Sequence, residues 1–222
     1  MPSELGLNIV CYTAIFGGIK DRLYPPGGDN DGVRFVAFVD DPSAKAPDGW
    51  KLRGAVESLP NKRRQARWHK THPHKLFPAA DYTLWIDGCL TPRYSVRLMI
   101  EECLQGRDLC VFKHGERSCL YQELEACLRL RKDDPQVMRR QVDEYRRQGY
   151  PYLNGLAETT AVLRRHISAI EQFDECWWRE IRNGSLRDQL SFDYVCRCSG
   201  ISYSHFPGSR TSSPYFRWRA HR

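Results

Sequence analysis

The sequence predicts a single α/β domain built around a mostly parallel β-sheet. Short apolar segments rich in β-forming residues alternate with amphipathic helical segments through most of the chain. The chain has 222 residues, 41% of them hydrophobic, which is enough for one large domain with a buried core. We expect one domain over residues 1–222, with a core at about 8–208 and a basic tail at 209–222.

The net charge of the chain indicates which kind of ligand it binds. The formal net charge is +7 and the sequence pI is about 9.0, which favours anionic ligands. Basic and acidic residues are mixed along the chain, except at residues 62–64 and 217–222. A nucleic-acid-binding protein more often has a concentrated basic stripe. We therefore expect phosphate-bearing small molecules as ligands, and no specific nucleic-acid partner.

The cysteines indicate a reducing compartment. There are nine, with no CxxC pair and no zinc-ribbon spacing, and most lie in apolar segments. Residues 1–6 do not resemble a signal peptide, and no apolar segment is long enough to cross a membrane. These features predict a cytoplasmic protein without a transmembrane segment.

The first strands end in glycines and acids. Residues 8–16 form a predicted buried strand that ends at Gly17 and Gly18, and residues 33–39 form a second strand that runs into Asp40 and Asp41. Residues 49–56 are expected to form an edge strand. Adjacent acids at a strand end can bind a metal, a ribose or a base N–H, but they are also ordinary turn and cap residues.

A basic helix follows at residues 62–70, beginning at or just after Asn61. Arg63, Arg67 and Lys70 fall at positions i, i+4 and i+7, which places them on one helical face. A diphosphate would need such a face, although a solvated surface has the same pattern.

The next strand, residues 82–86, is apolar and ends at Asp87 and Gly88. Ligands of open α/β sheets bind outside the carboxyl ends of the strands. Asp87 is therefore a candidate to hold a metal or a sugar hydroxyl, and the alternative is an Asp that closes a turn.

Further elements continue the alternation. Thr91 and Pro92 are predicted to begin a helix that ends at Gly106, and residues 109–112 form a strand that leads to His114, Glu116 and Arg117. The remaining predicted elements are helices at 118–130 and 135–148, a strand ending at 162–166, a helix marked by Ile170, Phe173 and Trp177, and a last helix opened by residues 185–189.

The start of that last helix has two interpretations. Ser185 and Asp188 fit a capping box, which gives Asp188 a structural role. Alternatively, Asp188 and Gln189 are polar groups held at a helix start to face a substrate. His205, in a Pro/Gly-rich loop, has few obvious core contacts.

Several of these segments together resemble a known family. They are residues 12–18 (YTAIFGG), 66–70 (ARWHK), 73–78 (PHKLFP), 84–88 (LWIDG), 114–117 (HGER), 177–178 (WW) and 187–192 (RDQLSF). In this order they resemble the plant and bacterial TOD/MUCI-type glycosyltransferase-like domain. The resemblance runs from about Tyr12 to His205.

The resemblance implies a GT-A-like three-layer α/β/α fold and a retaining glycosyltransferase that uses a UDP- or GDP-linked sugar, with a glycan, lipid or protein as acceptor. It also implies Mn²⁺ or Mg²⁺ on the diphosphate, held by Asp87 and His205, although Cys89 stands where an Asp-x-Asp motif has its second acid. Asp188, Gln189, His114 and Glu116 would be catalytic. The implied donor-binding residues are Tyr12, Thr13, Ala14, Asp40, Asp41, Arg67, Lys70, Asn154, Gly155 and Arg187.

Two other functions stay open at this point. A metal-dependent hydrolase of the amidase or ceramidase kind would combine Asp87 with histidines, although the chain lacks the HExxH spacing. The candidate histidines are His69, His72, His74, His114 and His205. A non-catalytic nucleotide- or glycan-binding module would account for the missing second acid.

Overall fold

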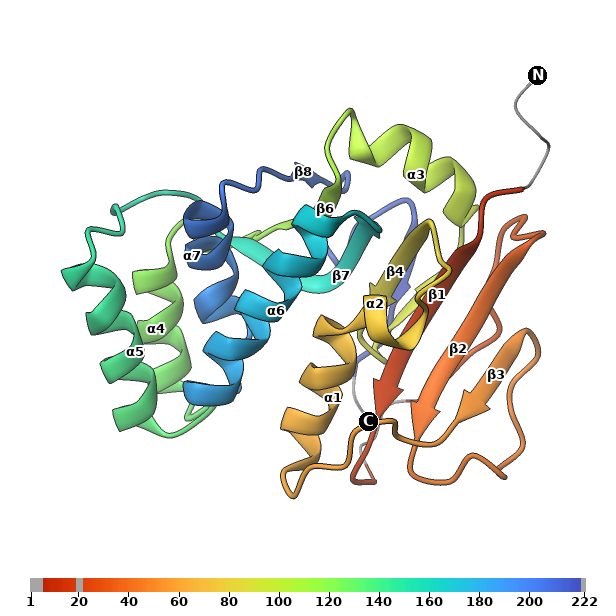
Figure 1. Ribbon diagram of the computed structural model, residues 1–222, viewed down its shortest axis with the longest axis horizontal. Helices are drawn as coiled ribbons and strands as arrows, with labels where there is room; N and C mark the ends of the chain where they lie inside the picture. Colours follow the sequence, from red (N-terminus) through yellow and green to blue (C-terminus); the bar gives the residue numbers. More distant parts are fainter. Residues whose placement is uncertain (1–5, 19–21, 221–222) are drawn as a thin grey trace.

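A computed structural model describes residues 6–18 and 22–220 of the chain (Figure 1). Residues 1–5, and with them most of the segment considered for a signal peptide, lie outside this part, as do residues 19–21 and 221–222. Within the described part, none of the helices combines the length and the apolar character needed to cross a membrane.

The centre of the fold is a seven-stranded sheet with the order β3-β2-β1-β4-β7-β6-β8. All neighbouring strands are parallel except for the pairs that involve β7, which runs antiparallel to β4 and β6. The predicted mostly parallel sheet is therefore confirmed. Its strands are β1 (Ile9–Ile15), β2 (Val33–Val39), β3 (Trp50–Arg53), β4 (Tyr82–Ile86), β6 (Leu109–Lys113), β7 (Ala157–Arg165) and β8 (Ser204–His205).

The strand directions bring the candidate site together. Six of the seven strands point the same way, so the residues that follow β1, β2, β4 and β6 meet at one edge of the sheet. Ile9–Tyr12 of β1 are completely buried because neighbouring strands flank this segment and both faces of the sheet are covered. The inner sheet therefore holds its carboxyl edge rigidly.

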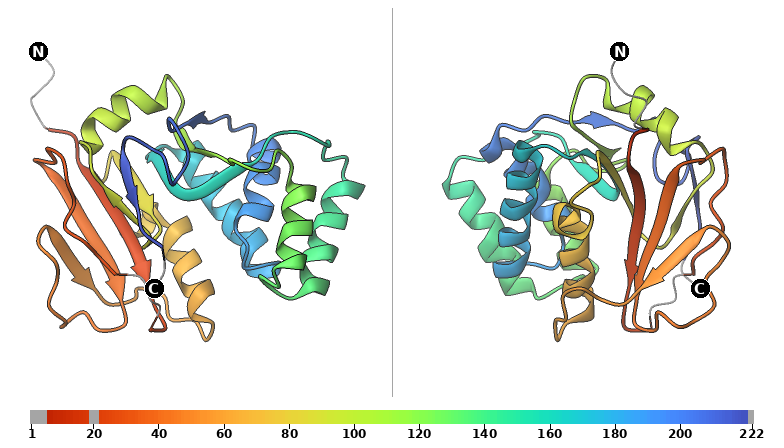
Figure 2. Two further views of the ribbon diagram at one scale, coloured as in Figure 1. Left: turned by 180° about the vertical axis from the view of Figure 1, so that it is seen from behind. Right: turned by 45° about the vertical axis from the view of Figure 1, so that its right-hand side comes forward.

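Helices cover both faces, as a three-layer fold requires. One face packs against α1 (Lys62–Thr71), α2 (Pro73–Leu76), α6 (Ser168–Asn183) and α7 (Gln189–Ser199). The other packs against α3 (Val96–Leu104) and a two-stranded ribbon of β5 (Leu90–Pro92) and β9 (Phe216–Trp218). Figure 2 shows α4 to α7 gathered at the end of the molecule opposite β1 to β3.

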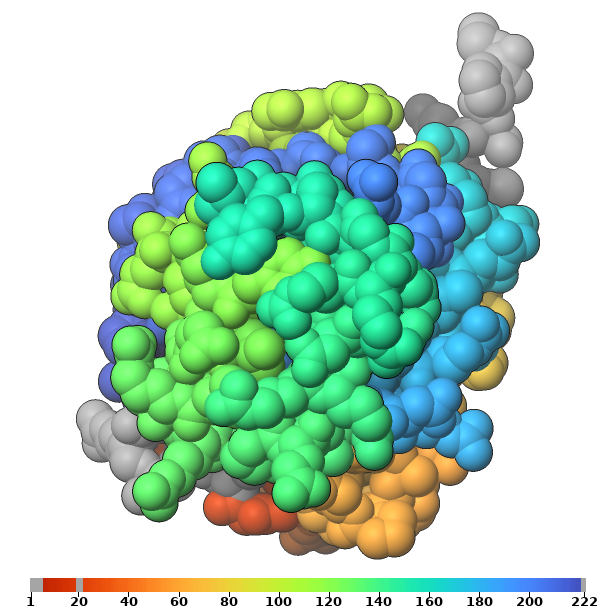
Figure 3. Space-filling model, turned by 90° about the vertical axis from the view of Figure 1, so that its left-hand side faces the viewer, coloured from red at the N-terminus to blue at the C-terminus, as the bar shows by residue number. Residues whose placement is uncertain are grey.

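Two helices extend the first helical layer outward. α4 (Leu120–Arg129) and α5 (Pro135–Arg147) pack on each other and on α7 through a separate apolar cluster. Asp134 caps α5, with its side chain accepting from the N–H groups of Gln136 and Val137. Figure 3 shows that α4 and α5 form the outer surface on this side.

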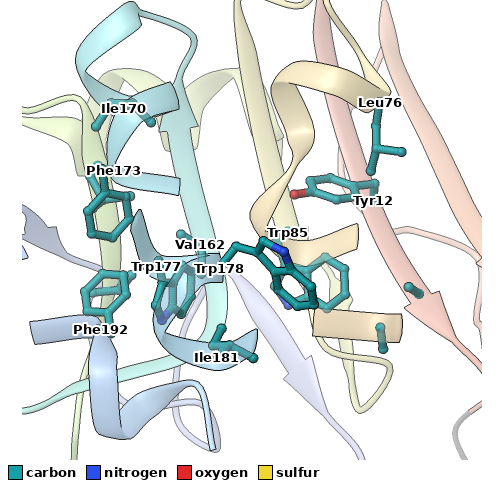
Figure 4. Close-up of a cluster of buried hydrophobic side chains, with 14 of the residues drawn as sticks. Tyr12, Leu76, Trp85, Val162, Ile170, Phe173, Trp177, Trp178, Ile181 and Phe192 are labelled. Atoms are coloured by element: carbon teal, nitrogen blue, oxygen red, sulfur yellow. The ribbon is translucent and has the colours of Figure 1, made fainter. Parts of the chain in front are cut away.

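An aromatic core lies between the sheet and the first helical layer (Figure 4). Trp177 of α6 packs edge-on against Phe192 of α7, and Tyr12 of β1 packs edge-on against Trp85 of β4. The four side chains are almost fully buried, so this core fixes α6 and α7 against the strands that end at the candidate site.

Three local predictions were wrong. Thr91 and Pro92 belong to β5, and Ser95 caps α3 instead, because its hydroxyl accepts from the N–H of Leu98. The predicted core ends too early, since Phe216 is buried and β9 pairs with β5. The proposed capping box is absent, because α7 begins at Gln189 and Asp188 makes no cap hydrogen bond.

Candidate functional site

A cavity of about 420 Å³ opens at the carboxyl edge of the sheet, where α1, β4, β7 and the start of α7 meet. Its lining is strongly basic for so small a space. The charged and amide side chains that line it are Arg63, Arg67, Asp87, Lys132, Arg187, Asp188, Gln189 and Arg210, and Ala14, Trp85, Thr159, Thr160 and Trp218 are among the others.

Two cations of helix α1, Arg67 and Lys70, contact the acids of this cavity, although of these two only Arg67 lines it. Asn61 caps the helix by accepting from the N–H of Arg64, which sets where the helix begins. The predicted basic face follows, and Arg67 and Lys70 both reach the acids of the cavity. Lys70 is fully buried, and its ammonium donates to Asp188 Oδ2 at 2.5 Å and to the Thr159 carbonyl at 2.5 Å.

Asp188 is the anionic centre of the cluster. Its Oδ2 also accepts from the Thr159 hydroxyl at 2.9 Å, and Arg67 Nε lies 3.2 Å from its Oδ1. Burial alone would raise the pKa of this carboxyl, but the charges of Arg67, Lys70 and Arg187 outweigh burial and lower the pKa well below its usual range. Asp188 therefore stays ionised at neutral pH.

Asp87 emerges from β4 as predicted and joins the same cluster. Its Oδ1 accepts from the Trp85 indole N–H at 2.8 Å and lies 3.8 Å from Lys70 Nζ and 3.9 Å from Arg67 Nη1. Two cations and an indole thus already face this oxygen, so Asp87 does more than close a turn.

The protein groups do not form a metal site by themselves. Among the residues that the structure describes, no three His, Cys, Asp or Glu side chains converge as ligands. His205, the predicted second ligand, lines a different cavity from Asp87. Asp188 lines the same cavity, but its two carboxylate oxygens already contact Lys70 and Arg67. The groups around Asp87 Oδ1 are two cations and an indole N–H, which repel a divalent ion or cannot ligate it.

Arg187, the first residue of the RDQLSF segment, contacts a charged side chain that does not line the cavity. The buried carboxylate of Glu123 lies 3.6 Å from Arg187 Nη2 and accepts from Arg117 Nε at 2.6 Å. His114 Nε2 lies 3.9 Å from the same carboxylate, and Glu116 is exposed beside Arg117. His114 and Glu116 are predicted as catalytic residues, but neither lines the cavity. His114 lies near Glu123, which contacts Arg187, and Glu116 pairs with Arg117.

Two core side chains donate hydrogen bonds to the backbone carbonyl of Lys70. Its carbonyl, near the end of α1, accepts from the Tyr12 hydroxyl at 3.0 Å and from Arg164 Nη2 at 3.1 Å. Arg164 in turn pairs with the buried Asp174 of α6. Tyr12, predicted to contact the donor, therefore contacts Lys70 from the core, and Thr13 is also fully buried.

A second cavity, of about 430 Å³, adjoins the carboxyl ends of β1 and β2. Ile15, Val39 and Leu52 give it an apolar wall, and Asp40 and Asp41 line it as well. Asp40 accepts from the N–H of Gly17, and Asp41 accepts from the N–H of Ser43, so both acids also make the turn contacts expected of them. Gly17 has a φ of +79°, in the left-handed region that favours glycine.

A third cavity, of about 560 Å³, holds three predicted site residues away from the basic cluster. Asn154, Gly155 and His205 line it together with Asp193 and Tyr203. Asp193 and Gln189 are one turn apart on α7, but they belong to different cavities. The structure therefore does not place Asn154 and Gly155 with Arg67 and Lys70.

The histidines considered for a hydrolase do not converge on Asp87. His69 is fully buried between Phe16 and Phe38, and burial lowers its pKa to about 4. His72 and His74 face Glu175 of α6, at 3.6 and 3.1 Å. His69 packs in the core, and His72 and His74 face a carboxylate of α6. These three histidines therefore do not form, with Asp87, the metal site that the hydrolase interpretation requires.

Sequence reasoning missed several residues of the basic cavity. Thr159 and Thr160 lie in the middle of a strand, Lys132 lies in the α4–α5 loop, and Arg210 and Trp218 lie in the segment predicted to be a tail. The only signal for Trp218 was an aromatic-rich stretch, residues 215–218, within a segment otherwise notable for its charge.

Two plant proteins are similar in sequence to this chain. The chain is 28% identical over 214 residues to the probable hexosyltransferase MUCI70 of Arabidopsis thaliana, covering 85% of this chain and 37% of that protein. It is 27% identical over 133 residues to the alkaline ceramidase TOD1 of the same plant, covering 55% of this chain and 29% of that protein. The chain thus spans about a third of the length of these relatives.

A solved structure with a similar chain path is the apo form of the WbbM bifunctional glycosyltransferase, with a TM-score of 0.48 and 10% sequence identity, covering 88% of this chain and 38% of that one. The model of the TOD1/MUCI70 glycosyltransferase-like domain matches residues 6–198, which is most of the sequence. The chain therefore belongs to the TOD1/MUCI70 glycosyltransferase-like domain family.

Proposed function

We propose that this domain transfers a sugar from a nucleotide-sugar donor to an acceptor. The observation that carries this proposal is the basic cavity, where five Arg or Lys side chains line a space that also contains an ionised Asp. Convergent cations that outnumber the acids around them suit a diphosphate. The hexosyltransferase name of one relative supports the same activity class.

The two cavities at the carboxyl edge of the sheet suit the two halves of such a donor. The diphosphate would lie against Arg63, Arg67 and Arg187, and the base and ribose would lie in the apolar cavity beside Asp40 and Asp41. Ala14 and Ile15 are successive residues of β1, so their side chains point to opposite faces of the sheet, and each lines one of the two cavities. The donor would therefore extend across the carboxyl edge of the sheet to occupy both.

The cluster can stabilise both charges of a sugar transfer. When the bond from the anomeric carbon to the diphosphate breaks, negative charge leaves on the phosphate oxygens, and Arg67 and Arg187 stabilise it. The anomeric carbon becomes positive, and the carboxylate of Asp188 is held ionised nearby. The resemblance of the Asp188-Gln189 pair to that of retaining enzymes suggests a retaining outcome. The acceptor hydroxyl oxygen would then bond to the anomeric carbon from the face that the diphosphate leaves, and its proton would pass to the departing phosphate oxygen.

Metal assistance is a separate part of the proposal. We favour stabilisation of the leaving group by the cations, because the donor set around Asp87 does not suit a divalent ion. If Mn²⁺ or Mg²⁺ takes part, Asp87 is its protein ligand, and a nucleoside diphosphate then binds much more tightly with the metal than with EDTA.

The test is a thermal-shift screen of UDP, GDP, their hexose conjugates and the parent nucleosides, each with Mn²⁺ and with EDTA. A ligand at a hundredfold excess over its dissociation constant stabilises a protein by about 3 kcal/mol, which moves the melting temperature by several degrees. We expect one diphosphate to stabilise the protein while its nucleoside does not. Absence of stabilisation by every nucleotide would overturn the proposal, and binding without turnover of any donor would identify a binding module.

A further inference from the structure

We propose that the C-terminal strand β9 completes the site, with Trp218 as the stacking platform for a glycan acceptor. The inference rests on the proposed function and specifies its acceptor. It concerns residues beyond the family-matched range of 6–198.

Strand β9 is joined directly to the loop that carries Asp87. It pairs antiparallel with β5, which begins three residues after Asp87, and Trp218 lies opposite Leu90. The N–H of Arg219 donates to the Cys89 carbonyl at 2.8 Å, which extends the connection by one residue. Trp218 is therefore fixed next to residues 87–89.

The pleat of β9 explains why Trp218 faces the cavity. Phe216 and Trp218 are two residues apart, so they lie on the same face of the strand. Phe216 is buried against Phe112 and Phe206. Trp218 lies beyond this core, where it lines the basic cavity and remains 38% exposed. A large aromatic ring is thus held rigidly at the mouth of a polar cavity.

The cations suited to the diphosphate of the donor come from other elements than Trp218, which leaves Trp218 available to the acceptor. Arg63 and Arg67 come from α1, and Arg187 comes from the start of α7. Trp218 instead arrives through β5 and β9, on the other face of the sheet. The cations suited to the diphosphate and the Trp218 ring thus reach the cavity from opposite faces of the sheet. Val39 and Leu52 of the proposed nucleoside cavity pack on the same face as β9, but they line a separate cavity beside β2 and β3.

The chemistry of the mouth favours a sugar over a lipid. An aromatic ring offers a flat apolar surface to the C–H face of a pyranose, and the surrounding charged groups can bind its hydroxyls. Arg210 lies at the same mouth, where it pairs with Glu158 at 2.8 Å. An acyl chain needs a continuous apolar surface, but the other exposed large apolar side chains of the described residues do not line this cavity. They are Leu7, Val56, Leu98, Leu130, Tyr152 and Leu153.

The experiment compares Trp218→Ala and Trp218→Phe with wild type on a printed array of oligosaccharides and on vesicles that contain ceramide. Arg217→Ala is the matched control, because this residue neighbours Trp218 on β9 but does not line the cavity. We expect wild type to bind a class of oligosaccharide, Trp218→Ala to lose at least tenfold in affinity, and Trp218→Phe and Arg217→Ala to keep most of it.

Nucleotide binding is measured on the same proteins, so the two proposals are judged separately. Unchanged nucleotide affinity in Trp218→Ala, together with weaker glycan binding, shows that the variant is folded and supports the acceptor role. Glycan binding at the wild-type level in Trp218→Ala, or wild-type binding to the vesicles but to no oligosaccharide, would overturn the inference. If wild type binds no nucleotide, the proposed function is overturned instead.

Discussion

Two buried ion pairs meet at Lys70, and their surroundings differ. The ammonium of Lys70 pairs with Asp188, and its carbonyl accepts from Arg164, which pairs with Asp174. The pair of Lys70 and Asp188 lies at the basic cavity, which Asp188 lines and where Arg67 and Asp87 add further charges. Arg164 and Asp174 lie in the aromatic core, with Arg164 Nε 3.0 Å from Asp174 Oδ1. Arg164 is also positioned over the ring of Trp177, so its surroundings are mostly apolar.

This difference sets the charge state of each acid. Asp188 has several cations around it, and they lower its pKa despite burial. Asp174 has one cation, and burial raises its pKa to about 7 in spite of Arg164. A surplus of positive charge thus keeps the cavity acid ionised, whereas the core acid takes up a proton close to neutral pH. The surplus is what a site for an anionic ligand requires.

The core pair nevertheless contacts the site through the backbone. Arg164 donates to the Lys70 carbonyl, and Tyr12 donates to the same atom. Buried ion pairs often contribute little net stability, because desolvation offsets the attraction between the charges. We infer that this pair positions the end of α1, and with it the ammonium of Lys70.

The largest effect is expected from breaking the cavity pair. Asp188→Ala leaves Lys70 buried without its closest carboxylate, and removing one partner of a buried pair typically costs about 3–5 kcal/mol. Urea denaturation measures this loss. Asp87→Ala is the matched control, because Asp87 is more exposed and 3.8 Å from Lys70, and it should cost clearly less. Equal losses in the two variants would contradict the ranking.

Exchanging the whole core pair is expected to cost less than breaking it. Arg164→Met combined with Asp174→Leu replaces the charges with apolar side chains in an apolar setting, so its unfolding free energy should stay within about 2 kcal/mol of wild type. Arg164→Met alone should be less stable than the double variant.

The double variant should also bind nucleotide about fivefold more weakly, since Lys70 loses one backbone hydrogen bond worth about 1 kcal/mol. Wild-type affinity of the double variant for nucleotide would show that the Arg164–Asp174 pair does not position Lys70.

A pH comparison sharpens the difference between the two acids. The folded-state pKa of Asp174 is raised to about 7, so its contribution to stability is full below its unfolded pKa of about 3.9 and is lost as pH rises through 7. The stability difference between wild type and Asp174→Asn should therefore shift by about 1.4 kcal/mol in favour of Asp174→Asn between pH 6 and pH 8.

Chemical denaturation of both proteins at the two pH values measures that shift. Taking the difference between them cancels the contribution of His69, His72 and His166, whose pKa values are each lowered to about 4. A difference that stays constant from pH 6 to pH 8 would mean that Asp174 does not titrate in this range.

The smallest effect is expected at an exposed pair. Asp143 and Arg146 lie at i, i+3 on α5 with their side chains more than half exposed, and such pairs contribute little. Asp143→Ala should change the unfolding free energy by less than about 0.5 kcal/mol, measured by the same denaturation. A loss comparable with that of Asp188→Ala would show that burial is not the deciding variable.

The sequence predicted the parts of this arrangement that follow local periodicity. The basic face of α1 could be recognised because Arg63, Arg67 and Lys70 have helical spacing, and Asp87 because it follows an apolar strand. Local pattern could not show that Lys70 is fully buried, because its partners Asp188 and Thr159 are 118 and 89 residues away. That contact depends on how α1, β7 and α7 pack.

The errors have physical causes of the same kind. Thr-Pro is a good helix start in isolation, but residues 90–92 pair with β9, more than 120 residues later in the chain. Asp188 follows Ser185 at capping-box spacing, but Lys70 and Arg67 attract its carboxylate into the cavity. His205 occupies a flexible-looking sequence, yet β8 pairs with β6 and places it at a separate cavity.

The most direct test of the basic cavity is calorimetric binding of a nucleoside diphosphate and of its parent nucleoside to wild type and to Arg67→Met, with Arg146→Met as the surface control. If the cavity holds the diphosphate, the diphosphate binds wild type at least tenfold more tightly than the nucleoside does. That advantage should fall about tenfold, or about 1.4 kcal/mol, in Arg67→Met and persist in Arg146→Met. Equal affinities for the two ligands, or an advantage unchanged in Arg67→Met, would contradict the account.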